Sequence, residues 1–349
     1  MVYLGKSAMV LLLLFGLAAF VLPEQVEDDV GTRQRIYAYP TANSDASQEA
    51  RDLLRTLYAI KGGYTLSGQH NYLEEPKKHT RRIHELTGEL PALVGYEMGV
   101  VLDHTEAEVE SYRQKIVDDA IATYKAGSFV TMTYHAAMPG QCQCWEQVNN
   151  GGISEEMFEE IITPGTALHK EWLADIDEVA VYLKQLRDHR VPVLWRPYHE
   201  MNGKWFWWGG QPKFQQLWNL MFERYSEVHK LDNLLWVWSP SAPNDYAARF
   251  ESYYVGDLRT DILAVDVYYN DYKQSHHDQL WKLAGGKPIA LGEVGELPDP
   301  ALLKGSQNQY VWFMAWGDEL ENKNDYRRIS SLYQMDRVLT RPDLIAYFD

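Results

Sequence analysis

The chain has 349 residues and a net charge of −16, and this acidic balance argues against partners that need clustered Lys and Arg: nucleic acids, anionic membranes and polyanionic substrates. Its two cysteines, Cys142 and Cys144, are too few for a disulfide framework or a zinc pattern. Twelve Trp and 23 Tyr are many for this length, and such rings either fill a core or stack on weakly polar ligands such as sugars.

Residues 1–25 have the pattern of an export signal. Lys6 precedes an apolar run from Ala8 to Leu22 that ends at Pro23. The run has the length of a signal-peptide core and is short for a membrane span of roughly 20 residues. An uncleaved anchor is the alternative, because no clear cleavage site follows. We expect a secreted, periplasmic or cell-surface protein without stable membrane insertion after processing, and an extended polar segment at 26–45.

Short apolar runs alternate with amphipathic stretches over residues 46–349. The runs are typical of strands buried on both faces of a parallel sheet, and they lie at 64–67, 92–95, 129–133, 193–196, 234–238, 262–267, 289–292 and 310–314. The clearest helical stretches are 105–125, 172–187 and 214–229. Eight strands separated by helices predict a single α/β domain, a (β/α)8 barrel. A doubly wound sheet is the alternative, but no glycine-rich G-x-G-x-x-G turn follows the first strand.

Two glutamates stand just beyond buried strands. A barrel places its active site at the C-terminal ends of its strands. Glu200 follows the fourth predicted strand and Glu293 follows the core of the seventh, and these strands face each other across the barrel mouth. A lone Glu at a strand end is usually a salt-bridge partner or a helix cap. A facing pair suits glycoside hydrolysis, in which one carboxyl is a protonated acid and the other an ionised nucleophile or base.

Charged and aromatic neighbours support this pair. Arg196 precedes Glu200 by four residues, so both side chains point to one side if the strand stays regular. Its positive charge would keep Glu293 ionised, and an ion pair at the bottom of the barrel is the alternative role. The four consecutive aromatic residues at 205–208 cannot all face inward on a regular element, so some should line a surface or cleft.

The segment Arg-Pro-Tyr-His-Glu-Met-Asn-Gly at 196–203, followed by Trp-Phe-Trp-Trp-Gly at 205–209, resembles glycoside hydrolase family 26, in which β-mannanases predominate. Similar support comes from Ser-Gly-Gln-His at 67–70, Thr-Tyr-His at 133–135, Asp-Val-Tyr at 266–268 and Leu-Gly-Glu at 291–293. The resemblance covers about residues 64–316. It implies a (β/α)8 barrel and retention at the anomeric carbon, with Glu200 as acid/base and Glu293 as nucleophile.

The resemblance also implies sugar-binding residues. His135 is similar to the histidine of the subsite just before the cleaved bond, and Trp316 and Trp205 are similar to the aromatic platforms before and beyond that bond. His199 would orient the nucleophile or bind sugar. Tyr268 would donate its hydroxyl to the nucleophile, with Asp266 on the same face, or Tyr269 would do so if the register is shifted by one residue.

The far end of the cleft is less defined. His70, Tyr96 and Glu97 are expected to line it. Some members of the family have an Arg after the platform Trp that binds a more distant sugar, whereas Gly317 stands there in this chain. Endo and exo action therefore both stay open.

The resemblance thus implies a retaining endo-β-1,4-mannanase that acts on mannan, glucomannan or galactomannan through a covalent glycosyl-enzyme intermediate. A mannobiose-releasing exo-mannanase, a mixed-linkage β-glucanase and a β-1,3-xylanase are alternatives within the family. A non-catalytic carbohydrate-binding barrel or a structural exported barrel would not need both glutamates. We expect a monomer whose partner is a β-mannan polysaccharide, with no cofactor and no metal site.

Two remaining motifs carry weaker expectations. His276 and His277 are expected to lie in a solvated loop, because a bound metal would need further ligands at suitable spacing. Cys142 and Cys144, in the loop after the third strand, are expected to be free thiols, with a bridge between them as the alternative.

Overall fold

The computed structural model describes residues 39–348. The expected export segment, 1–25, lies outside the described residues, as does most of the segment expected to be extended at 26–45. Its described part, 39–45, runs through bends and a turn before the first helix. Within residues 39–348, no helix has both the length and the apolar character needed to cross a membrane.

The strands form a closed parallel barrel, as predicted. Strands β2 to β9 pair in sequence order, and β9 pairs with both β8 and β2, which closes the barrel. The bounds are β2 (Gly68–His70), β3 (Leu93–Glu97), β4 (Phe129–Tyr134), β5 (Val193–Pro197), β6 (Leu234–Trp238), β7 (Ile262–Val267), β8 (Ile289–Val294) and β9 (Tyr310–Ala315). The predicted first strand divides into β1 (Thr65–Leu66) and β2, and β1 pairs with β9 and with β10 (Val338–Leu339). The other seven predicted strands begin and end within two residues of the observed bounds.

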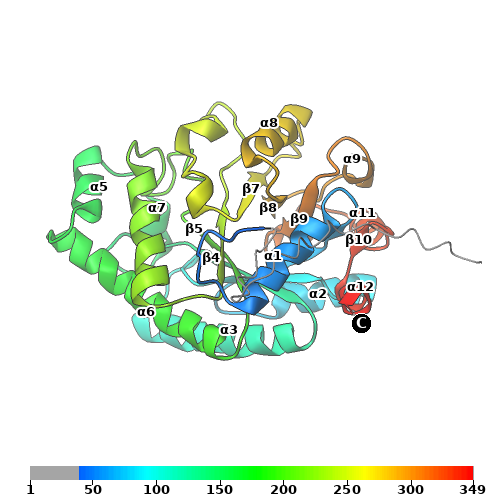
Figure 1. Ribbon diagram of the computed structural model, residues 1–349, viewed down its shortest axis with the longest axis horizontal. Helices are drawn as coiled ribbons and strands as arrows, with labels where there is room; N and C mark the ends of the chain where they lie inside the picture. The colour runs from blue at the N-terminus through cyan, green and yellow to red at the C-terminus, as the bar shows by residue number, and fades with distance from the viewer. Residues whose placement is uncertain (1–38, 349) are drawn as a thin grey trace, which may run out of the picture. The chain divides into compact units, whose positions relative to one another are not determined.

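Helices surround these strands (Figure 1). They are α1 (Gln48–Ile60), α2 (Lys78–Thr87), α3 (Glu106–Lys125), α4 (Trp145–Val148), α5 (Glu155–Ile162), α6 (Ala167–Asp188), α7 (Phe214–Glu223), α8 (Gln274–Ala284), α9 (Pro300–Lys304), α10 (Glu319–Asn322), α11 (Tyr326–Tyr333) and α12 (Arg341–Phe348). Thr105 and Glu108 form a capping box that begins α3. The predicted helix at 214–229 is α7 followed by a π-helical turn, Arg224–Val228. Two 3-10 turns, Phe250–Tyr253 and Asp257–Arg259, precede β7.

The strand residues alternate between two hydrophobic clusters, as the two-residue period of a strand requires. On β5, Trp195 belongs to the cluster shared with the outer helices, whereas Leu194 belongs to the barrel interior. The interior cluster also contains Leu53 and Leu57 of α1. Helix α1 therefore fills the N-terminal end of the barrel with apolar side chains, and polar side chains can gather at the C-terminal end.

Two expectations about individual motifs are wrong. His276 and His277 lie in α8 and are buried, with 5% and 4% of their surface exposed, because the apolar face of that helix packs on the barrel. Cys142 and Cys144 are joined by a disulfide bond rather than free, and their Cα atoms lie 5.4 Å apart, which is within the range that a disulfide spans.

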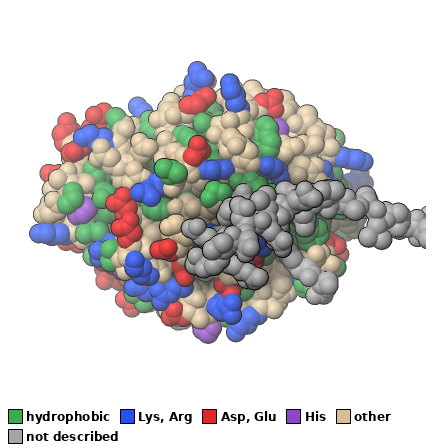
Figure 2. Space-filling model, viewed as in Figure 1, with side chains coloured by type: hydrophobic (Ala, Val, Ile, Leu, Met, Phe, Trp, Pro, Cys, Tyr) green, Lys and Arg blue, Asp and Glu red, His purple; other side chains and the backbone are tan. Residues whose placement is uncertain are grey.

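The surface charge agrees with the composition. On the face of residues 39–348 shown in Figure 2, Lys and Arg side chains are scattered among acidic ones rather than gathered in one patch. A surface that binds a phosphate backbone would need its Lys and Arg side chains gathered in one patch.

Candidate active site

A cavity of about 1070 Å³ lies at the C-terminal end of the barrel. Eight of the ten predicted site residues line it: His135, His199, Glu200, Trp205, Asp266, Tyr268, Glu293 and Trp316. The other two, Arg196 and His70, are 2% and 0% exposed and lie beneath the lining residues. The fold therefore brings together side chains that are up to about 250 positions apart in the sequence.

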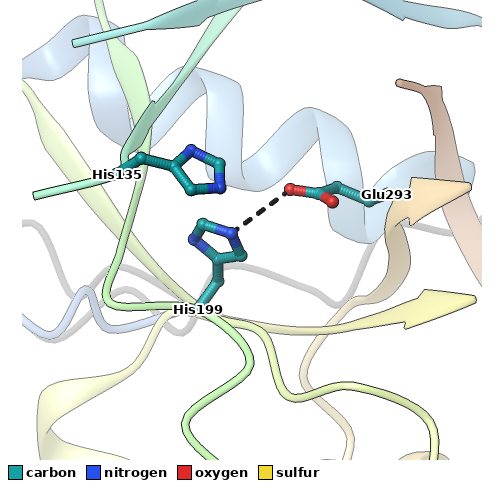
Figure 3. Close-up of side chains that lie close together, drawn as sticks. All are labelled: His135, His199 and Glu293. Atoms are coloured by element: carbon teal, nitrogen blue, oxygen red, sulfur yellow. Dashed lines mark ion pairs between the residues drawn. The ribbon is translucent and has the colours of Figure 1, made fainter. Parts of the chain in front are cut away.

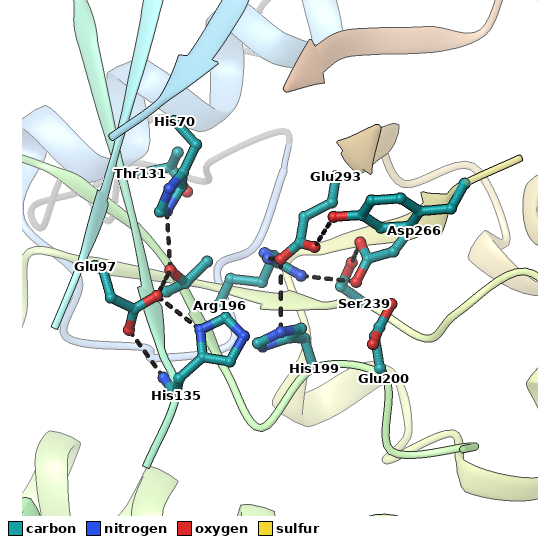
Figure 4. A network of polar contacts seen from close by, with 12 residues as sticks. His70, Glu97, Thr131, His135, Arg196, His199, Glu200, Ser239, Asp266 and Glu293 are labelled. Carbon is teal, nitrogen blue, oxygen red and sulfur yellow. Dashed lines mark hydrogen bonds and ion pairs between the residues drawn. The ribbon is translucent and has the colours of Figure 1, made fainter. Parts of the chain in front are cut away.

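Three carboxylates meet in this cavity. Glu200, Asp266 and Glu293 each place an oxygen within 4.8 Å of the others, and all three side chains are buried. Figure 4 shows Glu200 and Glu293 on either side of Asp266. Like charges at this spacing cannot all ionise easily, so the site favours protonation of at least one of these carboxyls.

The backbone places Glu200 differently from the sequence prediction. Strand β5 ends at Pro197, and Tyr198 and Glu200 have positive φ angles of 47° and 54°, so the strand does not stay regular as far as Glu200. The amide of Glu200 donates a 2.7 Å hydrogen bond to the carbonyl oxygen of Ser239, which fixes this turn against the end of β6. A positive φ is uncommon in residues other than glycine and is found at sites that require a particular side-chain direction.

A bulge places Glu293. In the pairing of β7 with β8, Val265 lies opposite Leu291 and Asp266 opposite Glu293, so Gly292 is the extra residue. A Cβ on Gly292 would lie 2.3 Å from Oγ of Ser239 and 2.6 Å from Oδ1 of Asp266. Glycine is thus required here by neighbouring side chains.

Arg196 and Tyr268 hold Glu293 from two directions. Arg196 donates to Oε1 of Glu293 through Nη2 and to Oδ2 of Asp266, at 2.9 Å, through Nη1. Tyr268 donates a 2.8 Å hydrogen bond to Oε2 of Glu293, and Tyr269 points to solvent with 90% of its surface exposed. The ion pair therefore lies at the barrel mouth rather than its bottom, and Tyr268 makes the expected contact.

The surroundings of the carboxyls shift the pKa values of Glu200 and Asp266. Burial, and then the charges of Asp266 and Glu293, raise the pKa of Glu200 well above its ordinary value. Burial and the charge of Glu293 also raise the pKa of Asp266, which Arg196 and Ser239 oppose. A carboxyl that stays protonated near neutral pH can act as a general acid, and this is the state expected of Glu200.

The histidines form the other wall. Burial, and then the positive charge of Arg196, lower the pKa of His199 well below its usual value, so its ring is neutral. Glu97, which was expected to line the cleft, is fully buried and lies 2.7 Å from Nδ1 of His135. Burial alone would raise the pKa of Glu97, but its contacts with His135 outweigh burial and keep that pKa low. Tyr96 points away from the cavity and donates to Asp119 on α3.

The aromatic run divides as predicted. Trp205 and Phe206 line the cavity, whereas Trp207 and Trp208 are fully buried. The indole nitrogens of the buried pair donate to the carbonyl oxygens of Ala136 and His199 and so fix the loop. Trp205 donates a 2.7 Å hydrogen bond to Oε2 of Glu200, so this ring contacts the Glu200 carboxyl directly.

Comparison with known proteins identifies the family of this chain. The sequence profile of glycosyl hydrolase family 26 matches residues 42–343. The chain belongs to this family. A mannan endo-1,4-beta-mannosidase of Thermothelomyces thermophilus is 32% identical over 322 residues, which cover 88% of this chain and 64% of that protein. The chain thus spans slightly less than two thirds of that relative.

Solved structures of family 26 proteins have the same fold. GH26A from Muricauda sp. MAR_2010_75 aligns with a TM-score of 0.82 and 39% identity, covering 86% of this chain and 99% of that one. A GH26-CBM35 beta-(1,4)-mannanase from Podospora anserina aligns with a TM-score of 0.76 and 32% identity, covering 92% of this chain and 72% of that one.

At the far end of the cavity, this family 26 chain has an aromatic corner that the sequence did not reveal. The ring of His70 stacks on Trp316, with centroids 4.2 Å apart, so His70 supports the platform rather than lining the cleft. The ring of Tyr72 meets Trp316 edge-on and its hydroxyl donates to Asp318. A Cβ on Gly317 would lie 2.2 Å from the Tyr72 ring, so the side chain missing at 317 makes room for Tyr72.

Proposed function

We propose that this chain is a retaining endo-β-1,4-mannanase that hydrolyses mannan, glucomannan or galactomannan. The observation that carries the mechanism is the spacing of Glu200 and Glu293, whose nearest ligand oxygens lie within 4.8 Å. Retaining enzymes separate their two carboxyls by about 5–5.5 Å, whereas inverting enzymes leave roughly 6.5–9.5 Å for a water molecule. The names of the related mannanases support the substrate class.

In the first step, Glu200 donates its proton to the glycosidic oxygen as the bond from that oxygen to the anomeric carbon breaks. The Glu293 carboxylate forms a new bond to the same carbon from the opposite face. Arg196 and Tyr268 hold the two oxygens of Glu293 so that one faces the substrate. The leaving sugar departs past Trp205, which contacts Glu200.

In the second step, Glu200, now ionised, takes a proton from water while the water oxygen attacks the anomeric carbon. The bond to Glu293 breaks, and both carboxyls return to their starting states. The raised pKa of Glu200 suits this alternation between acid and base. Two carboxyl groups and one water molecule supply every proton and every bond of this scheme, so it requires no cofactor.

A reducing-sugar assay on mannan, glucomannan, lichenan and β-1,3-xylan tests the proposal. We expect hydrolysis of the two mannans, and loss of that hydrolysis in Glu293→Ala and Glu200→Ala. Preference for lichenan or β-1,3-xylan would replace the substrate class while keeping the mechanism. A Glu293→Ala protein with near wild-type activity on mannan would contradict the assignment of the nucleophile.

A further inference from the structure

His135, His199 and Glu293 form a compact group of possible metal ligands. They come from the ends of β4, β5 and β8, and one potential ligand atom of each lies within 4.8 Å of the other two (Figure 3). Nε2 of His199 lies 3.5 Å from Oε1 of Glu293. The three residues are 3%, 1% and 4% exposed, so the group lies in the floor of the cavity rather than on an open surface.

His199 has no hydrogen-bond partner for either ring nitrogen among the described residues. Buried polar groups are almost always paired, so two unpaired ring nitrogens are available to a ligand, an ion or a water molecule. One of these nitrogens faces Glu293, as the dashed line in Figure 3 shows. A molecule or ion held between His199 and Glu293 would satisfy it.

His135 is oriented toward the same space. Its Nδ1 lies 2.7 Å from Oε2 of Glu97, and Glu97 in turn accepts hydrogen bonds from the amides of His135 and Gly99 and from the hydroxyl of Thr133. A carboxylate that accepts the Nδ1 proton leaves Nε2 of the ring free to bind a metal, as it does in many zinc sites. Figure 4 shows the ring between Glu97 and His199.

We propose that His135, His199 and Glu293 bind a divalent transition-metal ion, such as zinc, in the place of the sugar at the point of cleavage. Two imidazole nitrogens and one carboxylate oxygen are a donor set for zinc or copper, whereas calcium and magnesium prefer oxygen atoms alone. With bonds of about 2.0–2.2 Å, ligand atoms on tetrahedral zinc lie about 3.4 Å apart. His199 and Glu293 already have this spacing, and the ligand atom of His135 lies within 4.8 Å of both.

This inference rests on the proposed function in one respect: because Glu293 is the proposed nucleophile, the metal is an inhibitor. A metal-bound Glu293 cannot attack the anomeric carbon, and the ion fills the space of the sugar. Arg196 donates to the same oxygen of Glu293, but a carboxylate oxygen can accept from two directions. The positive charge of Arg196 weakens the attraction, so we expect reversible binding.

Calorimetric titration of the full chain with zinc chloride tests the site without any measurement of activity. We expect one zinc ion to bind, and we expect His135→Gln, His199→Gln and Glu293→Gln each to weaken binding by about tenfold or more, as the loss of a ligand should. His84→Gln is the matched control, because His84 is an exposed histidine on α2. The glutamine side chain has a volume similar to that of the side chain it replaces, and thermal melts test whether each variant is folded.

Two results would overturn the site: no zinc binding by the wild-type chain, or equal zinc affinity in the wild type and in every folded variant of the three ligands. A mannan assay with zinc then separates this inference from the proposed function. If zinc binds through these residues but the chain cleaves no mannan, the metal site stands and the proposed function fails. If the chain cleaves mannan and zinc neither binds nor inhibits, the proposed function stands and the metal site fails.

Discussion

The hydroxyl of Tyr268 donates a 2.8 Å hydrogen bond to Oε2 of Glu293, which it reaches from the end of the neighbouring strand. Burial, and then the charge of Glu293, raise the pKa of Tyr268 well above its ordinary value, so this residue remains a donor over the whole working pH range. The bond can therefore hold the carboxylate of Glu293, the proposed nucleophile, in place throughout the reaction.

Removing this hydroxyl should slow the reaction without unfolding the barrel. A hydrogen bond to a charged group contributes about 1.5–3 kcal/mol, so Tyr268→Phe should lower kcat/KM on mannan by roughly 10- to 150-fold. Tyr326→Phe is the matched control, because that side chain is exposed on α11 and does not line the cavity. Equal losses in the two variants, or no loss in Tyr268→Phe, would show that the contact does not act on the nucleophile.

The pH profile should depend on Trp205. Its indole N–H donates to Glu200, and this hydrogen bond lowers the Glu200 pKa, against the rise caused by burial. Trp205→Phe removes the donor, so the Glu200 pKa should rise further and the acid should stay protonated to higher pH. We predict that the alkaline limb of kcat/KM moves to higher pH. Phe206→Leu changes another ring that lines the cavity but makes no such bond, and it should leave the alkaline limb in place. An alkaline limb that moves to lower pH in Trp205→Phe would contradict this account.

Gly292 should tolerate no side chain. A Cβ there would press on Ser239 and Asp266, whose 2.7 Å hydrogen bond supports the ion pair with Arg196. Gly292→Ala should lower the free energy of unfolding by about 1–3 kcal/mol, as overpacking does, and should reduce kcat strongly. Denaturant unfolding and initial rates measure both effects. In Gly63→Ala the new Cβ meets only an ordinary contact at 3.5 Å, and this variant should behave as wild type.

Tyr72 should determine binding at the far end of the cavity. It lines the cavity beside Trp316, and its ring would clash with any side chain at position 317. An aromatic contact contributes about 0.5–1.5 kcal/mol, so Tyr72→Ala should raise KM for mannotriose by roughly 2- to 12-fold. The effect on mannohexaose should be smaller, because a longer chain keeps other contacts. Equal effects on both oligosaccharides would indicate a general loss of structure instead.

Much of the fold could be predicted because barrel strands are buried on both faces and appear in the sequence as continuous apolar runs. The C-terminal ends of those runs then locate most of the site, since parallel strands bring their ends to one rim. Glu200 and Glu293 were found in this way, and so were Asp266 and Tyr268, whose period-two spacing places them on one face of β7 and its extension.

Most of what the sequence did not predict depends on tertiary context. The positive φ angles at Tyr198 and Glu200 leave no pattern in non-glycine residues, so the strand seemed to continue. The stacking of His70 under Trp316 and the place of Tyr72 join segments about 245 positions apart. His276 and His277 are polar residues in a polar stretch of sequence, yet both are buried in α8. The helical period of that segment was a signal that could have shown this.

The anomeric form of the first product tests the central claim most directly. The claim is that Glu200 and Glu293 lie close enough for direct attack on the sugar, with no water molecule between the nucleophile and the anomeric carbon. Proton NMR of a manno-oligosaccharide digest, recorded before the product equilibrates, should show the β-anomer accumulating first. Initial appearance of the α-anomer would mean inversion by a water molecule and would contradict this account of the site.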